Sequence, residues 1–417
     1  MSMATVSART FRSLRRRNYR LYFVGQVVSI TGTWMQNVAQ AWFVVQLTHS
    51  PLAVGLLAVC QFGPYFLFGL FGGTFADRLN QRRLLIATQG AFLLSASALA
   101  TLTLTNHALI WEVYLLAAIN GSVTVLDTPV RQSFTIQMVG RDELPNAIAL
   151  NSSLFNASRI IGPAVAGGII AVAGVGLCFL FNALSFLAVI TALSLMREEE
   201  LFPIARDEQR LRFLRGAAEG LTFSWHTPVI RAVLGMMLVV ATIGVNFNVM
   251  LPVLASRTLH SGPEVFGLLS ALFGAGALCG ALTSASLGRA SARALLVGAL
   301  MFSAAELVLA PLRSVWDAAL VLVVVGFAFS LYTSQSNSTL QLNVPDRLRG
   351  RVLGLYGYVF FGTAPLGGLL AGWLAQTGGT QLAFIVAGGC SLAAVLCGMA
   401  YLRLGARAPS PVLTPAA

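Results

Sequence analysis

The chain has 417 residues, of which 56% are hydrophobic and 10% are charged, whereas an ordinary soluble domain carries roughly 25% charged residues. The formal net charge is +12, and all 27 basic residues are arginine, because the chain contains no lysine. This composition excludes a typical soluble enzyme, a disordered protein and a secreted disulfide scaffold. The missing lysine excludes a Walker A loop and Schiff-base chemistry. The remaining class is a polytopic membrane protein.

The potential metal ligands and nucleophiles are scattered along the chain. The five cysteines lie singly in apolar runs without a CxxC pair, and no HExxH or GxSxG motif occurs among the residues. Buried single cysteines usually pack as small apolar side chains. The sequence therefore predicts no metal site, no cofactor and no catalytic residue.

Apolar segments long enough to span a bilayer recur along the whole chain. A spanning helix needs about 20 mostly apolar residues, and a membrane admits only helices or closed barrels. The segments are too long for barrel strands, so we expect an all-α polytopic membrane protein with twelve transmembrane helices in two pseudo-symmetric six-helix bundles. The predicted spans are 21–47, 51–76, 84–105, 109–126, 147–175, 177–196, 230–254, 266–287, 294–312, 318–342, 352–375 and 382–404.

The arginines predict the orientation of these helices. With the N-terminus inside, 24 arginines lie in cytoplasmic segments or at the cytoplasmic ends of spans, only Arg257 and Arg313 lie outside, and Arg159 falls deep within a span. Positive residues concentrate on the cytoplasmic side, so we expect both termini in the cytoplasm and a multi-pass protein of the bacterial cytoplasmic (inner) membrane. The basic cluster at 12–20 serves as a topology anchor in this interpretation; specific binding of acidic lipid is the alternative. No signal peptide is expected.

Five segments follow from this layout. They are a basic cytoplasmic arm (1–20), a first bundle (21–196), a cytoplasmic central loop with an amphipathic surface helix (197–229), a second bundle (230–404) and a cytoplasmic tail (405–417). A shift of 204 residues places Gln137 on Gln341 and Asp142 on Asp346. A weak repeat of six helices is typical of transporters.

The loop after the second predicted span resembles the signature GxxxDRxxx[RK][RK] of the major facilitator superfamily. The matching residues are Gly73, Asp77, Arg78, Arg82 and Arg83. The resemblance implies a conformational switch, in which a carboxylate meets a helix N-terminus and the arginines meet carboxylates or lipid as the bundles move. The alternative is that these charges only cap and orient the helix.

The fifth predicted helix resembles the antiporter motif GPxxGG of the same superfamily, with one extra residue. Its residues are Gly162, Pro163, Gly167 and Gly168. In the family this motif is associated with exporters; a seam of small packing residues is the alternative. The stretches 18–29, 47–53 and 127–132 are similar to a branch of macrolide-efflux pumps and enterobactin exporters.

Two positions depart from that branch. The helix-4 arginine of the motif RxxQG is absent from 117–121, and Thr33 stands where relatives often carry Asp. These departures put a simple transfer of the family's proton site in doubt.

A polar stripe on the first predicted helix is expected to line the substrate cavity. Polar residues in membranes tend to face the bundle interior, although hydrogen bonds between helices are the alternative. The candidates are Gln26, Ser29, Thr33, Gln36, Asn37 and Gln40, with Asn246 and Asn337 from the second bundle.

Four deeply placed charges are candidates for coupling: Asp127, Arg131, Arg159 and Glu306. Each costs roughly 2.5–3.5 kcal/mol at a membrane centre, so each needs a partner or water. Asp127 and Arg131, four residues apart, could simply pair with each other. Arg159 could bind an anionic substrate, pair with Asp127 or act as a structural tie. Glu306 could carry a proton or merely lie at the periphery.

The resemblance implies a secondary active transporter, with proton-coupled efflux of small amphipathic molecules such as drugs, macrolide-like compounds or siderophores by alternating access. The alternative is a nutrient or metabolite importer, a proton symporter on the same fold. We expect a small-molecule substrate, protons and membrane lipid as partners, no nucleic acid, and function as a monomer. A membrane-embedded enzyme would need a clustered catalytic constellation, which the sequence lacks.

Overall fold

The computed structural model describes residues 11–76, 80–203 and 213–405, and within these ranges every regular element is helical. The first bundle follows a short 3-10 turn, η1 (Arg12–Arg15). Its long helices are α2 (Arg17–Thr48), α3 (Pro51–Ala76), α4 (Gln81–Leu104), α5 (Ile110–Val139), α6 (Leu144–Ala173) and α7 (Val175–Ser194). The last four residues of the predicted basic arm thus already belong to α2.

The second bundle contains several interrupted helices. Its elements are α9 (Pro228–Val239), the π-helical η4 (Val240–Gly244), α10 (Phe247–Val253), the π-helical η5 (Leu254–Thr258), α11 (Pro263–Ser286), α12 (Ala292–Leu309), α13 (Val315–Asn343), α14 (Asp346–Gly357), the π-helical η6 (Tyr358–Gly362) and α15 (Ala364–Gly405). Inside α15, Gly378 and Gly379 leave the helical conformation, and Gly379 has a φ of 70°. Only glycine adopts that angle without strain, so two helices meet here.

Ten helical segments among the described residues are long and apolar enough to cross a membrane. The segment Arg17–Thr48, which carries the polar stripe, is not one of the ten. One of the ten, Arg347–Arg403, is 57 residues long and contains the break at Gly378. These findings confirm an all-helical, multi-pass membrane protein, while the number of twelve spans stays a prediction.

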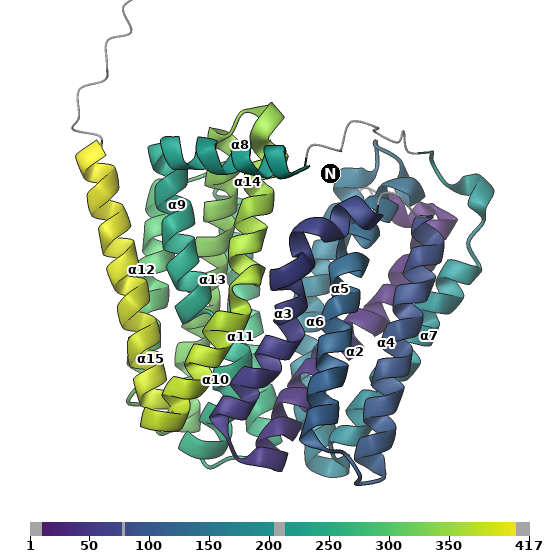
Figure 1. Ribbon diagram of the computed structural model, residues 1–417, viewed down its shortest axis with the longest axis horizontal. Helices are drawn as coiled ribbons and strands as arrows, with labels where there is room; N and C mark the ends of the chain where they lie inside the picture. Colours follow the sequence, from purple (N-terminus) through teal and green to yellow (C-terminus); the bar gives the residue numbers. More distant parts are fainter. Residues whose placement is uncertain (1–10, 77–79, 204–212, 406–417) are drawn as a thin grey trace, which may run out of the picture.

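The two ends of the molecule differ in arginine content. One end, called here the Arg-rich end, carries Arg16, Arg82, Arg197 and Arg231 at helix termini, with α8 (Phe213–His226) lying across it (Figure 1). The opposite end, called here the Arg-poor end, contains the turns after α2, α4, α6 and η5. Three of these turns use a residue other than glycine with positive φ, at His49, Asn106 and His260.

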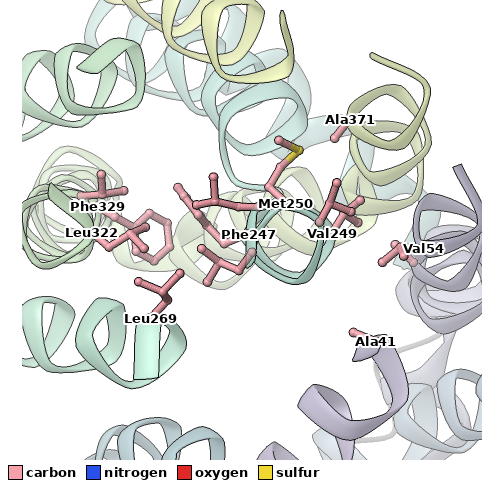
Figure 2. Packing of buried hydrophobic residues seen from close by; sticks show 14 of the residues in the cluster. Ala41, Val54, Phe247, Val249, Met250, Leu269, Leu322, Phe329 and Ala371 are labelled. Carbon is pink, nitrogen blue, oxygen red and sulfur yellow. The ribbon is translucent and has the colours of Figure 1, made fainter. Parts of the chain in front are cut away.

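Aromatic side chains fill the second bundle around α10. The Phe247 ring lies 4.8 Å from the Phe273 ring and 6.1 Å from the Phe302 ring, and Phe302 lies 6.0 Å from Phe329. Figure 2 shows Phe247 between α10 and the helices that carry Leu269, Leu322 and Phe329. Val249, on the other side of α10, lies toward Ala371 and Val54. The segment α10 therefore packs against its own bundle and against the first bundle.

Candidate transport pathway and coupling site

The glycines of α6 bring three helices together. A Cβ at Gly162 would lie 2.6 Å from the Trp34 Cβ on α2, and a Cβ at Gly167 would lie 2.9 Å from the Pro263 carbonyl oxygen on α11. By contrast, nothing lies within 4 Å of such an atom at Gly168. Small residues allow helix backbones to approach closely. Gly162 therefore fits α6 against its own bundle, and Gly167 fits it against the other bundle.

A second glycine seam joins the bundles between α3 and α15. A Cβ at Gly55 would lie 2.6 Å from the Gly368 carbonyl oxygen, and one at Gly372 would lie 2.7 Å from the Pro51 carbonyl oxygen. The neighbouring Gly367 packs against Thr242 of η4 in its own bundle. The Gly/Pro segment of α15 thus occupies the same kind of position as that of α6, between the first helix of its own bundle and a helix of the opposite one.

Further contacts between the bundles lie at the Arg-poor end. Arg257 donates to the His49 carbonyl oxygen, and Ser50 lies 3.2 Å from the Gln376 side chain. Trp42 and Phe266 stack with their ring centroids 6.0 Å apart. Figure 1 shows the two bundles converging at this end and standing apart at the Arg-rich end.

Further toward the Arg-rich end, the seam between α3 and α15 continues into η6. The Tyr358 hydroxyl donates to the Phe66 carbonyl oxygen at 2.8 Å, and the two rings stack. The contacts named here therefore span the Arg-poor half of the molecule and reach Phe66.

The predicted switch motif is only partly within the described residues. Gly73 lies in the last turns of α3, while Asp77 and Arg78 lie outside the described residues. Arg82 donates to the carbonyl oxygens of Leu193 at 2.8 Å and Ser194 at 3.0 Å, and it pairs with Glu198. Arg82 therefore ties the start of α4 to the end of α7.

The neighbouring Arg83 has an exposed side chain, and its backbone N–H donates to the Asn80 side chain, which caps α4. The Asn80 side chain accepts one of the free N–H groups of a helix start, as expected for an N-cap residue.

A buried charge network joins α5 to α2 and α4. Arg131 contacts Asp127 through Nε at 3.1 Å and through a terminal nitrogen at 2.5 Å, and it also donates to Gln26. Thr88 and Gln89 of α4 donate to the other Asp127 oxygen at 2.7 and 2.9 Å. Asp127 is only 4% exposed. Its charge is therefore compensated by one guanidinium and two neutral donors, and Arg159 is not among its partners.

The polar stripe of α2 divides into two groups. Gln36 accepts from Asn182 at 2.7 Å, and Gln40 accepts from Gln61 at 3.3 Å and donates to the Val113 carbonyl oxygen at 3.4 Å. Gln36, Gln40 and Gln26 therefore form hydrogen bonds between helices, which was the alternative to lining a substrate cavity.

Thr33 and Asn37 are exposed, and they lie on the same helical face as Gln26 and Gln40. The remaining α2 candidate, Ser29, is buried, and its backbone carbonyl oxygen accepts a hydrogen bond from the Thr33 hydroxyl at 2.9 Å. Thr33 and Asn37 therefore remain the α2 candidates for contact with a substrate.

Arg159 lies on α6 between the face that contacts α2 and the face that contacts α11. The helix α6 contacts α2 through Ser158 and Gly162, and it contacts α11 through Pro163 and Gly167. At about 100° per residue, Arg159 lies between these two faces. The opposite face carries the exposed apolar residues Ile161 and Val165. Within the described residues no carboxylate pairs with Arg159, and its buried Nε has no hydrogen-bond partner.

The two remaining candidates from the second bundle are engaged with their own helices. Asn246 donates to the carbonyl oxygens of Thr242 and Ile243 at 2.9 and 3.1 Å, where the helix is interrupted after η4. Asn337 accepts from Gln341 on the same helix. Glu306 on α12 is fully buried, away from the α2 stripe. Within the described ranges no group of three His, Cys, Asp or Glu side chains could hold a metal ion.

Sequence reasoning missed the groups that complete these networks. The signal that could have identified these groups is a polar residue within an apolar helix. The residues concerned are Thr88, Gln89, Gln61 and Asn182. It could not have assigned their partners, since these lie on other helices.

Comparison with known families and proteins agrees with this architecture. The sequence model of the family described as "Transmembrane secretion effector" matches residues 8–409. The staphyloferrin A transporter of Staphylococcus aureus is 26% identical over 88% of this chain and 92% of its own. The multidrug efflux pump Tap of Mycolicibacterium fortuitum is 28% identical over 85% and 88%, respectively. The enterobactin exporter EntS of Escherichia coli O9:H4 (strain HS) is 27% identical over 81% and 80%.

Solved transporters share the fold at low sequence identity. The nucleoside transporter NupG superposes with a TM-score of 0.70 at 14% identity, covering 94% of this chain and 99% of its own. A bacterial homologue of the iron transporter ferroportin, solved in an inward-facing state, gives a TM-score of 0.69 at 15% identity, covering 92% and 98%. At such identities the likeness concerns the architecture alone.

Proposed function

The chain belongs to the transmembrane secretion effector family of the major facilitator superfamily, a family of transporters and not of enzymes, and we propose that it exports small amphipathic molecules by proton-coupled alternating access. The observation that carries the proposal is the pair of glycine seams, α6 with α11 and α3 with α15, that close one end of the molecule. Drugs and siderophores are the substrate classes that the relatives favour.

Export is favoured over import by the kind of relatives that cover most of the chain. An enterobactin exporter and a multidrug efflux pump align over at least four fifths of its length. The nucleoside transporter shares the fold but only 14% of the residues, so it gives no argument about direction. Within the predicted antiporter motif, Pro163 and Gly167 lie at the contact between α6 and α11 of the opposite bundle, which is consistent with the same direction.

The seams suggest how the two halves move. In this conformation the bundles are packed at the Arg-poor end and separated at the Arg-rich end (Figure 1). With the arginines placed on the cytoplasmic side of the inner membrane, the contacts between the bundles close the outward half, which an exporter keeps closed while it collects its substrate from the cytoplasm. Rocking of one bundle against the other would open the Arg-poor end.

The network of Asp127, Arg131 and Gln26 is the coupling site that we propose for the first bundle. Protonation of Asp127 would cancel its attraction for Arg131 and free the guanidinium to change partners. One proton moving through 100 mV supplies about 2.3 kcal/mol. At roughly 1.4 kcal/mol per factor of ten, this sustains about a 50-fold gradient of a neutral substrate. A single carboxyl group would therefore be sufficient.

Transport into inverted membrane vesicles tests the proposal. Wild-type vesicles energised to an acidic interior should accumulate a fluorescent amphipathic probe such as ethidium, and a protonophore should abolish the accumulation. Asp127→Asn should lose this proton dependence. The matched control is Glu112→Gln, because Glu112 only caps the start of α5. Accumulation that ignores the protonophore would contradict proton coupling, and accumulation of the probe by intact cells would indicate an importer.

A further inference from the structure

A second buried carboxyl group lies in the other bundle, far from the Asp127 network along the chain. Glu306 is 0% exposed on α12, and neither of its oxygens has a hydrogen-bond partner among the described residues. A carboxylate in that position would carry a full uncompensated charge. Burying such a charge is far more costly than burying the neutral acid. The surroundings of Glu306 therefore favour the protonated form.

A small cavity lies beside Glu306. Its volume is about 10 Å³, which is close to the space that one water molecule requires. Its lining comes from η4, α10, α12 and α15 and includes Gly244, Asn246, Phe247, Glu306, Leu370 and Phe384. A water at this position would need two to four polar partners, and Glu306 offers two free oxygens.

A further polar atom lies close to the carboxyl group. The Ser391 hydroxyl on α15 is buried, and none of the residues that the structure describes forms a hydrogen bond with it. A Cβ placed at Gly244 would lie 2.8 Å from the Ser391 oxygen and 3.3 Å from Glu306 Oε2. The absence of a side chain at Gly244 therefore leaves both polar groups beside the backbone of η4.

The charged and titratable groups around this site are few. Among the residues that line the cavity, Glu306 is the sole titratable one. The helices packed around the site carry further titratable groups. Cys390 precedes Ser391 in α15, and Tyr332 of α13 packs at Gly298 of α12, about two helical turns from Glu306. No arginine or histidine pairs with Glu306 in the described part of the chain. The charge of this group is therefore controlled by its access to water and protons.

The backbone facing Glu306 is interrupted. The π-helical η4 ends at Gly244, and Val245 and Asn246 are not helical before α10 begins. Breaks of this kind often occur at functional sites. Here the break lets the chain bend beside the carboxyl group, at the segment that also packs against α15.

We propose that Glu306, with Ser391, forms a proton-binding site in the second bundle. The neutral acid fits the dry packing of α12 against η4 and α15. Loss of the proton leaves a carboxylate that requires more hydration than the small cavity can hold, so the site must open to admit further water. A role of this site in driving export rests on the proposed function, whereas its protonation does not.

Infrared difference spectroscopy on the purified full-length protein tests the protonation directly. A protonated carboxyl group gives a C=O stretching band that a carboxylate lacks. In a titration from acidic to alkaline pH, the wild type should retain such a band above the pH at which exposed carboxyl groups ionise. Glu306→Gln should lose that band, whereas Glu264→Gln and Asp127→Asn should keep it. Glu264 is the matched control because it is exposed.

Hydrogen exchange tests the coupling to packing. Compared with Glu306→Gln at each pH, the wild type should lose protection in η4 and α12 as the band disappears. A band that persists in Glu306→Gln would overturn the proposal, as would protection that follows pH identically in both proteins. A loss of the band that requires sodium ions would also overturn it. If Glu306→Gln does not fold, Ser391→Ala should shift the titration of the wild-type band, and no shift would count against the site. None of these measurements depends on transport.

Discussion

Gly167 on α6 and Gly267 on α11 face each other across the seam between the bundles. A Cβ placed on Gly267 would lie 2.7 Å from the Gly167 Cα and 2.6 Å from the Pro163 carbonyl oxygen. These are backbone atoms, which cannot rotate away as a side chain could. The packing at the Arg-poor end therefore depends on the absence of a side chain at both positions.

The first prediction concerns this seam. Gly267→Ala should push α6 and α11 apart, because overpacking of a tight contact costs about 1–3 kcal/mol. The conformation closed at the Arg-poor end should therefore become less populated, by roughly tenfold for each 1.4 kcal/mol. The measurement is the labelling rate of a single cysteine introduced at Val54, which is 1% exposed on α3, in a variant without the native cysteines. Gly168→Ala is the control, because a Cβ there meets nothing within 4 Å, and equal labelling rates in the two variants would refute the explanation.

The second prediction concerns the balance of charge at Asp127. Arg131→Gln removes its cation and should lower stability by about 3–5 kcal/mol, because breaking a buried ion pair leaves an uncompensated charge. The double variant Asp127→Asn with Arg131→Gln removes both charges, so it should recover much of that loss. Thermal unfolding of the purified variants in detergent provides the comparison. If the stability lost in the double variant equals the sum of the losses in the two single variants, the two side chains do not act as a pair.

The helical class and the Gly/Pro segments could be predicted from sequence, because apolar length and small-residue spacing are local properties. The spans predicted at 51–76 and 230–254 correspond to the helix Pro51–Ala76 and to the interrupted segment from Pro228 to Thr258. The interruptions at η4 and η6 could not be predicted in the same way. They depend on packing between helices, and nothing in the apolar pattern marks Val245 as a break.

The candidate site was predictable at the level of residues but not of partners. Asp127 and Arg131 could be paired from their spacing of four residues, since i and i+4 side chains meet on a helix. The donors Thr88 and Gln89 come from another helix, and only the tertiary structure brings them to Asp127. For the same reason the sequence left open whether Gln36 faces a cavity, whereas the structure shows it bonded to Asn182.

The third prediction separates two neighbouring arginines of the signature loop. Arg82→Ala should lower the thermal stability measurably, because it removes two hydrogen bonds to the end of α7 and the pair with Glu198. Hydrogen bonds to charged donors contribute about 1.5–3 kcal/mol each. Arg83→Ala should change it little, because that side chain is exposed. Equal losses in both variants would instead favour a shared role, such as binding of acidic lipid.

The fourth prediction concerns the charge of the transported molecule. Arg159 lies between the α2 and α11 faces of α6 without a carboxylate partner among the described residues, and an unpaired charge in this position is compensated by an anion or by water. Phe155 lies one helical turn before Arg159 on the same side of α6, and its ring lies 5.5 Å from the ring of Trp34 on α2. An amphipathic anion could therefore place its charge on Arg159 and its apolar part on these rings.

Competition in the vesicle assay measures this preference. Arg159→Gln should weaken inhibition of probe transport by an anionic competitor such as carboxyfluorescein about tenfold, whereas Arg159→Lys should retain most of it, because the charge is kept. Inhibition by a cationic competitor should be equal or stronger in Arg159→Gln, since a repulsive charge has been removed. If inhibition by both competitors weakens in parallel in Arg159→Gln, Arg159 supports the packing of α6 against α11 and does not select the substrate. That packing is close at Gly274, whose missing side chain leaves room for the Arg159 backbone.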